Sequence, residues 1–309
     1  MKKLFISIII FSVAYSANAC PICGCGVGGF YIGLLPTYKS KFIGVRYQYA
    51  HYETRLADQP DQFSHDYYHI VELYGGLTFG GHWQVMGFVP YHFNHQVTDD
   101  GVEDKNGLGD MSVLINYKIW QSTKLTKNNK AFSQELWLGA GAKLPTGKYG
   151  VNFSDSTNTE LDDLLGDVNS QMGTGSLDFI ANAMYNIHIN KFGINTTVNY
   201  KINTANSSSF RYGDRFAANV FGYYEAKVSK SVYMAPNVGM MYEHVSQNRL
   251  ADSKVNETGG YASLASLGLD INFKKITVGT NVQLPAFQRY SLGQTKYKTR
   301  GLVHVTYTF

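Results

Sequence analysis

Apolar and polar residues alternate with a period of two along much of this 309-residue chain. In the clearest segment, residues 192–203, Ile194 and other apolar or aromatic residues fall on one face, while Asn195 and other polar residues fall on the opposite face. Residues 111–119 and 276–284 repeat this pattern. A period of two places successive side chains on opposite faces of a β-strand. The sequence therefore predicts an all-β fold of long, two-faced strands.

The first 19 residues have the composition of a secretory signal peptide. Met1-Lys2-Lys3 is basic, residues 4–14 are apolar, and Ala17-Asn18-Ala19 forms a small-x-small cleavage site. The alternative is an N-terminal membrane anchor. The apolar stretch is short for that role, because a spanning helix needs about 20 residues. We therefore expect export, with residues 1–19 removed.

An exported chain of this kind can place its apolar faces either in a soluble core or against lipid. Beyond residue 19 no apolar run reaches the length of a spanning helix, which excludes a helical membrane protein. Aromatic residues lie near the ends of the alternating segments, where amphipathic rings favour the boundary between water and lipid. We therefore expect the apolar faces to contact lipid and the polar faces to surround an interior. The expected girdle residues are Tyr185, Tyr200, Tyr224, Phe273, Phe287 and Tyr307.

The chain ends with an alternating segment, residues 301–309, that closes on Tyr307-Thr308-Phe309. A final strand that ends in Phe, with an aromatic residue two positions earlier, resembles the C-terminal signature of bacterial outer-membrane β-barrels. The resemblance implies an outer-membrane location in contact with outer-membrane lipids. It also implies that Tyr307 and Phe309 are read by the barrel-insertion machinery.

Counting the alternating segments predicts a transmembrane antiparallel up-and-down β-barrel of about twelve strands over residues 41–309. An even number is usual for bacterial single-chain barrels, and a fourteen-strand barrel is the alternative. Residues 20–40 are expected to form a separate segment, in the lumen or at the periplasmic mouth. Short turns are expected on the periplasmic side and long loops outside. Three of the expected long links cover residues 97–108, 121–133 and 291–300, the second of them on the periplasmic side.

The alternation also predicts which charged and ionisable side chains line the lumen. A charge that faces a narrow interior needs either a partner or water. Such a lining therefore forms either a water-filled passage or an ion-pair network that closes the interior, and the sequence leaves both open. The predicted lining residues are Arg46, Glu72, His92, Lys118, Lys143, Asp178, His188, Lys201, Glu225, Glu243, Asp270 and His304.

The three cysteines of the chain, Cys20, Cys23 and Cys25, lie within six residues of one another. Three thiolates at this spacing can bind a soft metal ion such as copper or zinc. Alternatives are a redox-active Cys20–Cys23 pair, an acylated Cys20 and a purely structural disulfide. A tetrahedral zinc site lacks a local fourth ligand, which His51, His65, His69 or a lumen histidine can supply. A role for this cluster implies a periplasmic metal or redox partner.

Two further stretches resemble a known family. Residues 107–110 (Gly-Leu-Gly-Asp) open a predicted strand, and residues 144–149 (Leu-Pro-Thr-Gly-Lys-Tyr) follow another. Both are similar to the outer-membrane transporter-like family named for the MetA pathway of phenol degradation, which implies a barrel that moves small organic molecules. The Cys-x-x-Cys-Gly-Cys-Gly opening departs from that family and resembles uncharacterised Bacteroidota envelope barrels, which puts a phenolic substrate in doubt.

These features predict an outer-membrane channel or transporter for small solutes, with a metal-binding or redox-sensing N-terminal segment. The alternative is a non-transporting envelope scaffold that partners a periplasmic metal or redox protein. We do not expect an enzyme, because His69, His244 and Ser246 on the outward face form no set of nucleophile, base and orienting group. The net charge of +4 is spread without a basic block, so nucleic acid is not an expected partner.

Overall fold

The computed structural model describes residues 41–309 except residues 57–61, 100, 126–130, 152–167, 169 and 252. The predicted signal peptide and the cysteine segment, residues 1–40, lie outside the described residues. Within the described part of the chain, no helix is both long enough and apolar enough to cross a membrane.

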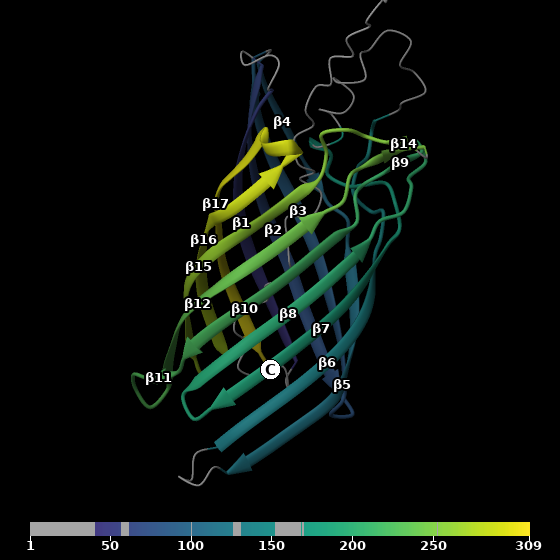
Figure 1. Ribbon diagram of the computed structural model, residues 1–309. Coiled ribbons are helices and arrows are strands. Elements are labelled where there is room, and N and C mark those ends of the chain that lie inside the picture. The colour runs from purple at the N-terminus through teal and green to yellow at the C-terminus, as the bar shows by residue number, and fades with distance from the viewer. Residues whose placement is uncertain are drawn as a thin grey trace, which may run out of the picture.

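Twelve long antiparallel strands form a single sheet that closes on itself (Figure 1). Each strand pairs with its neighbours along the chain, and β1 pairs with β17 to complete the barrel. The prediction of a twelve-strand up-and-down barrel is therefore confirmed over the fourteen-strand alternative. The strands are β1 (Phe42–Arg55), β2 (Phe63–Phe79), β3 (Trp83–Thr98), β5 (Ser112–Leu125), β6 (Ala131–Lys143), β7 (Asp178–Ile189), β8 (Phe192–Ile202), β10 (Arg215–Tyr224), β12 (Val232–Val245), β15 (Gly260–Phe273), β16 (Ile276–Tyr290) and β17 (Thr295–Thr308).

The two faces of the barrel wall differ as the alternation predicts. On β8, Asn195 and Asn199 are buried, whereas Ile194 and Tyr200 are more than 40% exposed. The same reversal runs around the barrel, and the outward face carries a belt of exposed Val, Ile, Leu, Phe and Tyr. An apolar surface of this extent is unfavourable in water. In a bilayer it contacts hydrocarbon, which is the arrangement that a transmembrane barrel requires.

Tight turns gather at one end of the barrel, where the chain also ends (Figure 1). Gly80 and Gly81 join β2 to β3 with φ of 60° and 72°, a conformation that glycine adopts without strain. Asn190 and Lys274 begin still shorter turns between β7 and β8 and between β15 and β16, also with positive φ. We assign this end to the periplasm, because short turns belong on that side.

The opposite end is elaborated by short strands. β4 (Gly101–Leu108) pairs with the upper part of β3. β9 (Phe210–Arg211), β13 (Arg249–Leu250) and β14 (Ser253–Lys254) form a small separate sheet. The remaining short strand, β11 (Ala226–Lys227), pairs with β12 near the periplasmic end (Figure 1).

The predicted long links 97–108, 121–133 and 291–300 are wrong in large part. The first is the β3–β4 hairpin, and in the second, β5 and β6 continue as a paired hairpin beyond the periplasmic end of their neighbours (Figure 1). In the third, a short 3₁₀ turn, Ser291–Gly293, leads directly into β17. Their polar composition indicated loops. In the structure, adjacent segments pair as strands, and their backbone N–H and C=O groups hydrogen-bond to one another.

Candidate functional site

The inner wall of the barrel holds the polar side chains that the alternation singled out. Nine of the twelve predicted lining residues are at least 92% buried: Arg46, Glu72, His92, Lys118, Lys143, Asp178, Glu243, Asp270 and His304. The other three, His188, Lys201 and Glu225, are half-buried near the ends of their strands. Eleven of these side chains lie on the face of the strands opposite the apolar belt, and Glu225 lies directly after β10.

A row of amide side chains crosses neighbouring strands on one side of this wall. The cross-strand register aligns Gln84 with Asn116, Asn116 with Gly139, Gly139 with Asn182, and Asn182 with Asn199. Asn182 Nδ2 donates to Asn116 Oδ1 at 2.8 Å, and Asn116 Nδ2 donates to Gln84 Oε1 at 3.1 Å. Among the described residues, neither amide atom of Asn199 has a hydrogen-bond partner. The row therefore ends in an amide that can still bind another polar group.

Gly139 on β6 provides the space that this amide row needs. A Cβ at this position would overlap the side-chain oxygen of Asn116 and press against the backbone oxygen of Ile115. The glycine therefore lets amides from β5 and β7 meet across the intervening strand β6. Glycine often marks such a close approach within a strand.

The two stretches that resemble the phenol-pathway family meet at the extracellular rim of the barrel. Thr146 Oγ1 donates to the backbone oxygen of Gly109 at 3.1 Å and accepts from the Met111 amide at 2.8 Å. The Gly147 amide donates to Asp110 Oδ1 at 2.9 Å. These bonds join the start of β5 to the segment that follows β6.

Lys143 is the central charge of this rim. Its Nζ lies 2.5 Å from Asp110 Oδ2 and 2.9 Å from Asp178 Oδ2. Asp110 Oδ2 also accepts the Thr174 amide at 2.8 Å, and Asp178 Oδ1 accepts the Thr204 amide at 3.0 Å. A buried lysine between two carboxylates, each with backbone donors, is compensated. The motif residues thus tie three extracellular segments to the top of the wall.

Lower on the wall, two further ion pairs join neighbouring strands. Arg46 on β1 pairs with Glu72 on β2, its direct cross-strand neighbour. His304 Nε2 lies 2.8 Å from Asp270 Oδ1, and Asn237 Nδ2 donates to the other oxygen of Asp270 at 3.3 Å. Each of these buried side chains has an opposite charge or an amide within reach. The wall at this level is therefore polar but close to electrically balanced.

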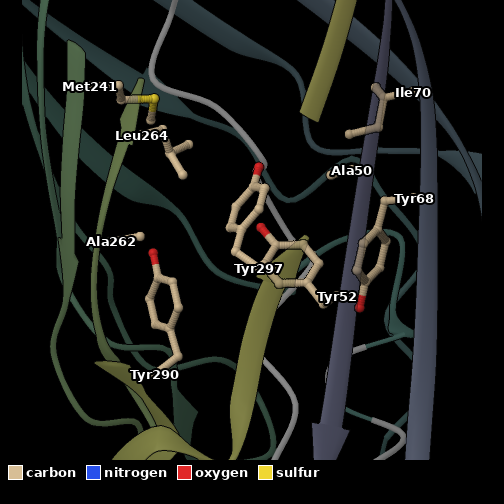
Figure 2. Packing of buried hydrophobic residues seen from close by; sticks show 9 residues of the cluster. All are labelled: Ala50, Tyr52, Tyr68, Ile70, Met241, Ala262, Leu264, Tyr290 and Tyr297. Atoms are coloured by element: carbon tan, nitrogen blue, oxygen red, sulfur yellow. The ribbon is translucent and has the colours of Figure 1, made fainter. Parts of the chain in front are cut away.

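The side of the wall opposite the amide row is rich in tyrosine (Figure 2). Tyr52 and Tyr297 lie with ring centroids 4.4 Å apart, and the Tyr290 ring points toward Ala262. The cluster is drawn from β1, β2, β12, β15, β16 and β17: Ala50, Tyr52, Tyr68, Ile70, Met241, Ala262, Leu264, Tyr290 and Tyr297. These rings cover part of the inner face with apolar surface, which the sequence analysis did not predict.

Glu243 is fully buried beside this tyrosine cluster. Its Oε2 lies 2.6 Å from Arg215 Nη2 on the adjacent strand β10, and its Oε1 accepts a hydrogen bond from the Tyr290 hydroxyl. The carboxylate therefore has both a guanidinium and a hydroxyl partner. Removing either partner would leave a buried charge partly unsatisfied.

Three ionisable side chains lie nearer the periplasmic mouth: the half-buried His188 and Glu225 and the buried Lys118. His188 Nε2 is 3.4 Å from Glu225 Oε2. Lys118 Nζ lies 4.8 Å from the centre of the buried Trp137 ring and donates to Gln121 Oε1 at 3.0 Å. These groups give the lower mouth both signs of charge.

Sequence reasoning missed several residues of the inner wall, among them Asp110, Arg215 and Tyr290. Asp110 was noticed only as part of a motif, because it precedes its strand and its partners come from distant segments. Arg215 begins β10, so extending the alternation by one strand end would have found it. Tyr290 ends β16 and lies beyond residue 284, where the alternating segment recognised in the sequence ends.

The C-terminal aromatic residues lie on the outer surface at the periplasmic end. The rings of Tyr307 and Phe309 are edge-to-face with centroids 5.1 Å apart, and both are at least 40% exposed. Their recognition by the insertion machinery remains a prediction.

No protein-family model matches the chain, and a search of curated proteins gives no match. Solved structures do match its fold. An outer-membrane channel from Pseudomonas putida F1 is 15% identical with a TM-score of 0.57, and the match covers 96% of this chain and 98% of that chain. The β domain of the Bordetella autotransporter BrkA is 9% identical with a TM-score of 0.48, covering 88% and 100%. The NanC porin is 11% identical with a TM-score of 0.40, covering 86% and 100%.

The wall and this likeness define the class of the protein. A closed antiparallel barrel with an outward apolar belt and a polar inner face is a transmembrane β-barrel of the bacterial outer membrane. At 15% identity the similarity to this channel shows the fold alone. Evidence for an activity comes from the side chains of the inner wall.

Proposed function

We propose that the chain is an outer-membrane channel for small polar solutes. The amide row is the observation that carries this proposal, because it makes one side of the interior polar without adding a fixed charge. The ion pairs beside it support the same conclusion, since compensated charges wet the wall but do not strongly attract either sign of ion.

Planar-bilayer recording tests the proposal directly. Purified, refolded protein should give steady conductance steps, and the reversal potential in a potassium chloride gradient should stay near zero because charges of both signs lie close together on the described wall. Absence of any current from correctly folded barrels would contradict the proposal.

The substrate class is a finer proposal. The Gly-Leu-Gly-Asp and Leu-Pro-Thr-Gly-Lys-Tyr stretches resemble the phenol-pathway transporters, and the amide row lines the interior with groups that hydrogen-bond to hydroxyls. We infer that small organic solutes with hydroxyl groups pass better than ions of similar size. Liposome-swelling rates for a simple phenol, a neutral sugar and a charged sugar acid test this, and the charged solute is expected to be slowest.

The same tyrosine cluster favours a second candidate, a plugged barrel that acts as an envelope scaffold. Nine buried residues occupy one side of the inner face, among them Tyr290 and Tyr297, which are at most 1% exposed. A scaffold would give folded, heat-modifiable protein with no conductance. The bilayer experiment therefore separates the two candidates.

We further propose that Cys20, Cys23 and Cys25 bind copper or zinc or act as a redox centre, although they lie outside the described residues. Their spacing in the sequence is the supporting observation. Metal analysis of detergent-purified protein, together with thiol counting, should show bound metal or a change in thiol state. The variant with all three cysteines replaced by serine should lose the metal bound by these thiols and the change in thiol state. Incorporation of labelled palmitate would instead assign Cys20 to lipidation.

A further inference from the structure

A second cluster of metal-ligand side chains lies on the outer surface of the barrel, away from the cysteines. His51 and Glu53 occupy the outward face of β1, and His65 on β2 is the direct cross-strand partner of Glu53. Their nearest ligand atoms all lie within 4.8 Å of one another. Glu53 Oε1 is 3.7 Å from His65 Nδ1 and 4.0 Å from His51 Nε2.

The surroundings hold these three side chains in place. His51 stacks on Tyr67 with ring centroids 4.4 Å apart and an interplanar angle of 11°. A register shift between β1 and β17 at His51 and Tyr52 marks a bulge, a feature that commonly re-aims neighbouring side chains. From β17, Lys298 Nζ contacts Glu53 Oε2 at 2.7 Å. This contact leaves Oε1 directed toward the two imidazoles.

His51 provides an independent sign of an incomplete site. Its Nε2 atom is buried and has no hydrogen-bond partner among the described residues. A buried nitrogen with no partner is costly, and nearly all such atoms are satisfied by protein, water or an ion. The side chains are 17% exposed for His51 and 28–29% for Glu53 and His65, so an ion can reach the cluster from outside.

We propose that His51, Glu53 and His65 bind a divalent transition metal of the zinc or copper(II) class. Two imidazoles and a carboxylate are the ligands that such ions favour. Ligands of a tetrahedral zinc ion at about 2.0–2.1 Å lie about 3.4 Å apart. Side-chain movements of about 1 Å therefore bring the three ligand atoms to these separations. Lys298 then orients the carboxylate through its second oxygen, as outer-sphere partners do. The fourth position stays open to water or an outside ligand.

The site lies at the extracellular edge of the apolar belt. On β1 the outward residues change from Val45 and Tyr47 to His51 and Glu53, and on β2 the corresponding change is from Val71 to His65. A metal bound here would lie at the boundary between the lipid surface and water. It would also cross-link β1 and β2, the first hairpin of the barrel.

The test is zinc titration of the detergent-purified full chain in which Cys20, Cys23 and Cys25 are replaced by serine, so that thiols contribute nothing. Calorimetry should show one zinc ion per chain. His65→Ala and Glu53→Gln should each weaken binding by more than about tenfold, because even outer-sphere changes cost that much. With copper(II), electron paramagnetic resonance should show nitrogen coupling that His51→Ala reduces.

His69→Ala is the matched control. His69 lies on the same face of β2, but its Nδ1 is hydrogen-bonded to the Tyr47 hydroxyl at 2.7 Å. This variant should bind zinc like its parent. Thermal midpoints without metal show whether each variant is folded. The proposal is overturned if the serine variant binds no zinc, or if His65→Ala binds zinc as tightly as its parent.

Discussion

The two sides of the inner wall are built from different side chains. On the side formed by β3 to β8, amides hydrogen-bond to one another and leave Asn199 available. On the other side, tyrosine rings pack beside the Glu243–Arg215 ion pair. Alternation determines which way a side chain points, while the residues on neighbouring strands determine what it contacts. Solute contact is thus expected on the amide side, and rigidity on the tyrosine side.

The largest effect is expected on the tyrosine side, at Glu243. Glu243→Ala leaves Arg215 buried without its carboxylate and should cost about 3–5 kcal/mol of unfolding free energy. Urea titration of the barrel in detergent or liposomes measures it. The control is Glu225→Ala, whose pair with His188 is half-buried and should cost less than about 1 kcal/mol. Equal effects would mean that burial does not set the strength of these pairs.

On the amide side the corresponding variant is Gly139→Ala. The added Cβ overlaps Asn116 and pushes the amide row apart, at a cost of about 1–3 kcal/mol. Gly87→Ala on β3 is its control, because a Cβ there meets no atom within 4 Å. If both variants unfold at the same urea concentration, the amide row is not packed as described.

An effect of similar size is expected from the Tyr290 hydroxyl on the tyrosine side. Tyr290→Phe removes the hydrogen bond to Glu243 and should cost about 1.5–3 kcal/mol, the value for bonds to charged groups. Tyr242→Phe changes an exposed ring on the outer face and should fall within about 0.5 kcal/mol of wild type. If Tyr290→Phe unfolds at the same urea concentration as wild type, the hydroxyl does not stabilise the buried charge of Glu243.

The last change, at Asn199, is measured through ion selectivity. Asn199→Asp adds an uncompensated negative charge to the wall, so the reversal potential in a salt gradient should move toward cation selectivity. Asn199→Ser keeps the residue neutral and should leave the reversal potential unchanged. If Asn199→Asp also leaves it unchanged, ions do not pass along the amide side.

Much of this architecture could be predicted because a strand has only two faces. Residues 192–202 gave the correct outward and inward sets, and the number of strands followed from counting such segments. The contacts of Asp110 with Gly147 and Thr174 could not be predicted, since 37 and 64 residues separate the partners. The pairing of Glu53 with His65 depends on the register of one hairpin and on a bulge, which alternation leaves undetermined.

Cysteine scanning along β8 in a cysteine-free background tests the orientation of the wall most directly. Single substitutions at residues 194–199 would be exposed to a charged thiol reagent in liposomes, while quenching by a lipid-borne probe is measured in parallel. We expect the reagent to label positions 195, 197 and 199, and the lipid probe to quench a label at positions 194, 196 and 198. Labelling without a period of two, or with the two sets exchanged, would contradict a polar interior inside a lipid-facing barrel.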